Sequence, residues 1–181
     1  MGSVQIRDGD AVTDVDKWDR AVITQAANHH NIHLGRTFTA SYLDESVAND
    51  ASLEFLVQTG ALQAHMGLHA NGGGSFELYL FEGTTVSAAG TSLAAVQRNR
   101  TSSTTATATV THTPTITADG TQLEVEFIAG GTGGIASGSQ GDFHEEWVLA
   151  PNTNYLVRVK NVAGVAEEMG LIIDWYEPTI P

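Results

Sequence analysis

The sequence contains no cysteine, which excludes a disulfide framework, a thiolate zinc site and a thiol nucleophile. It has 8 Lys+Arg against 21 Asp+Glu, and this formal net charge of -13 argues against the clustered cations that nucleic-acid binding requires. No apolar run approaches the roughly 20 residues that span a bilayer, and the N-terminus lacks a basic and apolar signal peptide. We therefore expect neither a nucleic-acid nor a membrane partner.

Hydrophobic residues make up 41% of the 181 positions, enough for a packed core in one domain with a short arm. From Thr37 onward the dominant period is two, which is typical of strands with one buried face. The predicted strands lie near residues 37–42, 53–57, 62–70, 76–80, 93–97, 105–113, 122–127, 143–149, 155–160 and 168–175. No helical pattern separates them, so we predict an all-β fold, a two-sheet antiparallel β-sandwich of jelly-roll type.

One of these runs makes a specific prediction about burial. In residues 122–127 the alternation places Leu123, Val125 and Phe127 on one face, opposite a glutamine and two glutamates. We expect the three apolar side chains to face the core.

The first 35 residues differ from the rest. They hold five aspartates and a weak helical stripe, in which Val15, Trp18, Val22 and Ala26 recur at three- and four-residue spacing and Gly35 ends the element. The following HHNIH run is a poor helix tail, so a loosely ordered arm is the alternative. We predict that residues 1–35 form an arm or short helix for docking, and that residues 36–181 form the sandwich.

Seven histidines are many for this length, and imidazole is a common metal ligand. His29, His30 and His33 crowd the end of the arm. His65 and His69 share a strand face but lie roughly 13 Å apart at strand rise, too far to hold one ion. A site would require one of them to meet His29 or His33 across the fold. Otherwise these are polar surface or interface side chains, and we predict no metal and no cofactor.

The remaining motifs do not predict an enzyme. The glycine-rich run 130–134 lacks the Lys-Ser/Thr of a phosphate loop, so it is expected to be a strand connection. There is no Gly-x-Ser-x-Gly elbow, and nothing sets the separation of carboxylates such as Glu77 and Glu145. A cupin-type metal enzyme would need a carboxylate just after two close histidines, which is missing here. Trp147 and Trp175 lie on apolar strand faces, so core packing is favoured over sugar stacking.

Four segments carry a resemblance to a known family, namely residues 60–91, 99–123 (NRTSSTTATATVTHTPTITADGTQL), 128–134 (IAGGTGG) and 146–164 (EWVLAPNTNYLVRVKNVAG). Together they resemble virion structural proteins of tailed bacteriophages, including capsid decoration (cement) proteins. The resemblance implies a homotrimeric β-sandwich that is made in the host cytoplasm and binds the major capsid protein on the outer surface of the virion. It implies no enzymatic activity.

We therefore predict a structural cement protein that stabilises a capsid from outside. Trp18, His29, His30 and His33 are the predicted partner-binding residues, because an apolar side chain in an acidic arm is best used buried against a partner. The alternative is a head-fibre or tail module that binds a receptor or glycan.

Overall fold

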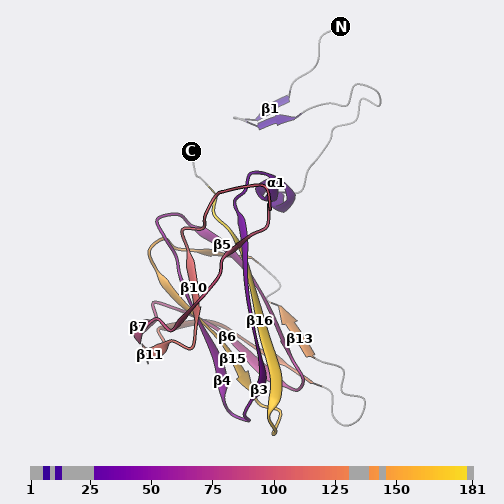
Figure 1. The fold of residues 1–181 in the computed structure, drawn as a ribbon, viewed down its shortest axis with the longest axis vertical. Helices are drawn as coiled ribbons and strands as arrows, with labels where there is room; N and C mark the ends of the chain where they lie inside the picture. The colour runs from indigo at the N-terminus through magenta and orange to yellow at the C-terminus, as the bar shows by residue number, and fades with distance from the viewer. Residues whose placement is uncertain (1–5, 9–10, 14–26, 131–138, 143–145, 179–181) are drawn as a thin grey trace.

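The computed structural model describes residues 6–8, 11–13, 27–130, 139–142 and 146–178, and these are almost entirely β (Figure 1). The first six-stranded sheet has the order β12 (Thr121–Ile128), β6 (Phe76–Glu82), β15 (Asn154–Asn161), β4 (Ser52–Gln58), β10 (Thr109–His112), β8 (Thr91–Leu93). The second has the order β13 (Ser139–Asp142), β5 (Ala64–Gly72), β16 (Glu167–Tyr176), β3 (Thr37–Val47), β9 (Val96–Gln97), with β14 (Trp147–Leu149) also on β5. Their strand pairs are antiparallel, and the predicted two-sheet sandwich is confirmed.

Three smaller elements complete the described chain. A two-stranded ribbon pairs β7 (Thr85–Ala88) with β11 (Thr115–Ala118), and a second pairs β1 (Ile6–Asp8) with β2 (Ala11–Thr13). The helix α1 (Ala27–His33) lies at one end of the sandwich (Figure 1).

The core lies between the two sheets and follows the predicted alternation. In β16 the side chains of Met169, Leu171, Ile173 and Trp175 are buried, and the residues between them point away from the core. The chain passes from one sheet to the other at each step from β3 to β6, and again from β12 to β13, from β14 to β15 and from β15 to β16. Strands far apart in sequence therefore pair, such as β3 with β16.

The prediction that Leu123, Val125 and Phe127 share a buried face is wrong. A β-bulge between residues 122 and 124 adds a residue, so the alternation changes face partway along β12. Val125 and Phe127 are 48% and 61% exposed on the outer face of the first sheet. Glu124 instead accepts a hydrogen bond from Trp147 Nε1 at 3.1 Å.

Two predicted strands have different bounds. The run 93–97 is split into β8 and β9, which belong to different sheets, so this segment bridges the sandwich edge. The run 105–113 becomes strand only at Thr109, because the backbone N–H groups of Thr107 and Ala108 donate to the carboxylate of Glu177 and not to a neighbouring strand.

The HHNIH run is helical, contrary to expectation, and forms the end of α1. Gly35 ends the helix as predicted. It has a φ of 67°, its N–H donates to the Ile32 carbonyl, and the Arg36 N–H donates to the Asn31 carbonyl, which together make a Schellman cap. The predicted stripe from Val15 to Val22 and the residues 131–134 and Phe143 lie outside the described residues.

Candidate functional site

The predicted histidine cluster lies on α1. His29, His30 and His33 are exposed, and His29 Nε2 lies 2.9 Å from His33 Nε2 with the rings edge to face. Because a helix turns about 100° per residue, His30 points to a different side from His29. The structure thus brings two of the three together. Trp18 lies outside the described residues.

Hydrogen bonds from residues 97–99 hold the end of α1, its Gly35 cap and the start of β3. Asn99 Nδ2 donates to the His33 carbonyl at 3.1 Å, and Gln97 Nε2 donates to the Gly35 carbonyl at 2.7 Å. The backbone N–H of Arg98 donates to the Thr37 carbonyl at 2.9 Å. The segment after β9 therefore positions α1, which the sequence pattern did not indicate.

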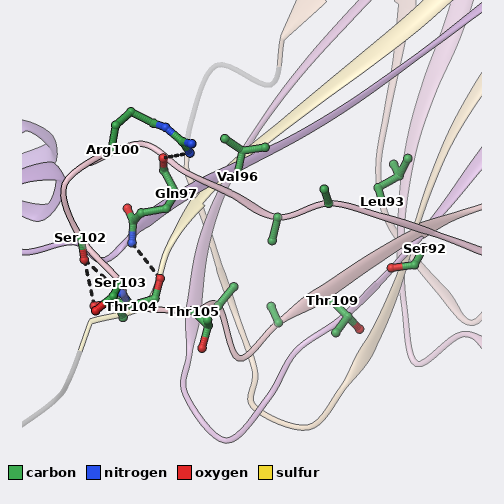
Figure 2. A pocket seen from close by; sticks show the side chains of 14 residues that line it. Ser92, Leu93, Val96, Gln97, Arg100, Ser102, Ser103, Thr104, Thr105 and Thr109 are labelled. Carbon is green, nitrogen blue, oxygen red and sulfur yellow. Dashed lines mark hydrogen bonds between the residues drawn. The ribbon is translucent and has the colours of Figure 1, made fainter.

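A groove of about 580 Å³ lies beside this segment, between residues 92–97 and 102–109 (Figure 2). Alanines and Leu93 make its apolar part, and serine and threonine hydroxyls line the rest with Arg100. The amide of Gln97 joins its two sides, because Nε2 also donates to the Thr104 carbonyl at 3.3 Å (Figure 2). Its lining includes no carboxylate and no imidazole, the side chains that most often act as general acids and bases.

The outer face of the second sheet is apolar over part of its area. Four exposed side chains lie on its strands, namely Leu43, Val96, Val148 and Ile172. Gly170 lies between Leu43 and Asn71 in the pairing, and a hollow of about 270 Å³ forms there because a glycine leaves room between larger neighbours. The signal in the sequence was the run of three apolar residues, 171–173, which interrupts the alternation of β16.

Two carboxylates on the same face have charged or imidazole partners there. Asp174 lies 3.8 Å from Arg98 and 3.9 Å from His69. Glu146 lies 2.6 Å from His65. His65 and His69 thus have different carboxylate partners and do not meet His29 or His33.

Tyr176 completes the second of these pairs. Its hydroxyl donates to Glu146 at 2.8 Å, and its ring stacks on His65 with centroids 4.5 Å apart. Burial, and then the hydrogen bond to Glu146, raise the pKa of Tyr176 to about 12. The hydroxyl is therefore a hydrogen-bond donor at neutral pH and not a base.

Two further observations bear on function. Within the described ranges, no group of three or more His, Asp or Glu side chains is placed to hold a metal ion, and no helix is long and apolar enough to cross a membrane. Trp175 is buried, as predicted for a core residue, and Trp147 is half-buried against the core. Tyr155 is buried as well.

No family model, no curated protein and no solved structure matches this chain. The resemblance of residues 60–176 to phage virion proteins stays a prediction.

Proposed function

We propose that this protein is a structural virion protein that decorates the outside of a tailed-phage capsid and stabilises it, without enzymatic activity. The observation that carries the proposal is the apolar outer face of the second sheet, with Leu43, Val96, Val148 and Ile172 exposed. Leu43 and Ile172 are diagonal neighbours on β3 and β16, and exposed apolar side chains that lie together mark protein contacts. Val148 and Val96 lie on strands at the two sides of the same face. A decoration protein acts by binding other proteins, so it needs an exposed apolar face for contact and needs no catalytic group.

We assign this face to contacts between copies, in the homotrimer that the sequence resemblance implies. A chain with a formal net charge of -13 repels a second copy over most of its surface. Asp174 and Glu146 are each paired with a cation or a hydrogen-bond donor, which reduces the repulsion on this face. Burial of the four apolar side chains then favours association.

The capsid contact is assigned to residues 1–35, with Trp18 and the histidines of α1 as the residues that bind the major capsid protein. The hydrogen bonds from Asn99 and Gln97 support this assignment, because they hold α1 at an exposed end of the sandwich. The order of the long strands supports the jelly-roll type, since β3-β16-β5-β14 and β4-β15-β6-β12 form two four-stranded layers with Greek-key connections.

The test is the copy number of this protein in purified virions, measured by quantitative mass spectrometry against the major capsid protein. A simple ratio to the capsid protein is expected, because decoration follows the capsid lattice. A handful of copies per particle would assign the protein to the tail or a fibre instead, and absence would overturn the proposal. Deletion of residues 1–35 should abolish capsid binding while circular dichroism still reports the sandwich.

The groove in Figure 2 favours a second candidate, a receptor- or glycan-binding module of the virion. Its hydroxyls suit hydrogen bonding to a sugar, although Trp175 and Tyr155 are buried and leave no stacking surface there. Glycan-array binding that is lost in Ser103→Trp, which fills the groove, and kept in Thr117→Trp on the exposed part of β11, would support this candidate.

A further inference from the structure

The two imidazoles of α1 face one another through their outer nitrogens. His29 and His33 are one helical turn apart and therefore lie on the same side of α1. Their Nε2 atoms are 2.9 Å apart, and both side chains are exposed to solvent. Metal ions that prefer imidazole are bound by two histidines at this spacing on a helix. We propose that His29 and His33 chelate a divalent transition-metal ion of the zinc, nickel or copper class.

The distance fits two bonds to one ion. Metal–nitrogen bonds of about 2.0–2.1 Å that enclose an angle of about 90–110° hold the two nitrogens roughly 2.8–3.4 Å apart. The observed 2.9 Å between His29 Nε2 and His33 Nε2 lies in this range. The binding atoms are therefore already at chelating separation, and small rotations of the rings aim both lone pairs at one point.

The protonation state of the pair also permits binding. In the hydrogen bond between the rings, one Nε2 donates and the other accepts. When the donating ring carries its proton on Nδ1, the other neutral tautomer, both Nε2 atoms are free to bind the ion. The exchange takes place through water, which removes the proton from Nε2 and supplies one to Nδ1, and both side chains are exposed to solvent. The negative net charge of the chain raises the local concentration of cations.

The other described histidines have partners of a different kind. His65 lies beside Glu146, His69 beside Asp174, and His112 stacks on Tyr42 with centroids 4.1 Å apart. Among the described residues, the α1 pair is thus the place where two imidazole nitrogens meet. With two protein ligands, the remaining coordination positions of the ion are open to water or to a donor atom from a partner. The proposed metal site does not depend on the proposed function.

The experiment is calorimetric titration of the untagged full chain with Zn²⁺, repeated on His29→Gln, His33→Gln and His30→Gln. Glutamine keeps a polar side chain and has a higher helix propensity than histidine, so α1 is retained. His30→Gln is the matched control, because it removes a neighbouring histidine that takes no part in the contact between the two Nε2 atoms. We expect His29→Gln and His33→Gln to weaken Zn²⁺ binding at least about tenfold. Substituting a residue that only hydrogen-bonds to a metal ligand already lowers metal affinity by about that factor, and these substitutions remove a ligand itself. We expect His30→Gln to bind like the natural chain.

Equal weakening in the three variants, or no weakening in any, would overturn the proposal. A second measurement, electron paramagnetic resonance of bound Cu²⁺, tests the proposal even if α1 unfolds in a variant, because the spectrum of the natural chain itself reports how many imidazole nitrogens bind the ion. The natural chain and His30→Gln should show two imidazole nitrogens at the ion, and His29→Gln should show one fewer. A natural chain whose Cu²⁺ spectrum shows fewer than two nitrogens contradicts the chelate.

Discussion

The carboxylate of Glu177 accepts hydrogen bonds from the backbone N–H of Thr107, at 2.8 and 3.0 Å, and from its hydroxyl, at 2.8 Å, although 70 positions separate the two residues. The same carboxylate accepts from the backbone N–H of Ala108 and from Trp175 Nε1. Glu177 is only 4% exposed. It therefore holds the segment before β10 against the end of β16, and it shapes one side of the groove.

Glu177→Gln should destabilise the fold by about 1–3 kcal/mol, because an amide cannot accept all of these bonds and leaves buried donors unpaired. Urea unfolding measures the change. Glu168→Gln, on the exposed part of β16, is the control and should change the free energy of unfolding by less than about 0.5 kcal/mol. Equal effects of the two substitutions would contradict the role given to Glu177.

Arg158 links the first sheet to the end of the β7–β11 ribbon through a bidentate pair with Asp119, in which both N···O distances are 2.8 Å. The hydrogen bonds from Arg158 lower the pKa of the Asp119 carboxyl. A lowered pKa stabilises the fold above the pKa of the unfolded chain, about 3.9. This contribution is lost as the pH falls below that value.

Asp119→Asn should therefore reduce stability at neutral pH and flatten the loss of stability between about pH 4 and pH 2. The loss at neutral pH should not exceed about 1 kcal/mol, because Asp119 is partly exposed. Thermal unfolding followed at several pH values tests this. A variant with the same acid dependence as the natural chain would show that the pair does not contribute.

Phe127 tests the change of face in β12. Because its side chain is 61% exposed, Phe127→Ser should cost less than about 0.5 kcal/mol. Phe76, fully buried on the neighbouring strand β6, is the matched aromatic, and Phe76→Ala should cost about 3–5 kcal/mol. A large loss in Phe127→Ser would instead place Phe127 in the core, as the alternation alone predicted.

Ile172→Glu tests the contact between copies. A carboxylate at the centre of the apolar face should convert an oligomer into monomers, because it adds repulsion and removes buried apolar area. Light scattering after size-exclusion chromatography measures the mass. Val165→Glu, at an apolar residue that is 59% exposed outside the strands, should leave the mass unchanged. If Ile172→Glu keeps the mass of the natural oligomer, the contact lies elsewhere.

The alternation of apolar and polar residues predicts burial correctly where a strand keeps one face toward the core along its whole length. The alternation from Met169 to Trp175 predicted the buried face of β16 because the period of a strand is set by its own backbone. Gly35 predicted the end of α1 for a similar reason, since only a residue that accepts a positive φ suits that cap.

The spacing of His29 and His33 is visible in the sequence, but the HHNIH run has a low helix propensity, so the pattern alone does not place the pair on one helical face. The helix forms because its end is capped at Gly35 and held by Asn99, a residue 66 positions beyond His33. A contact between residues so far apart in sequence cannot be predicted from a pattern of neighbouring residues.

The all-β class, most core positions and the end of the helix thus follow from local sequence pattern, because propensity and period are properties of short segments. The face of Val125 and Phe127, the partner of Glu177 and the exposure of Ile172 depend instead on contacts between distant segments. The bulge that turns Val125 and Phe127 outward depends on how β12 pairs with the neighbouring strand. The buried carboxylate of Glu177 needs hydrogen-bond donors from another segment. Ile172 is exposed because no other part of the described chain packs over it.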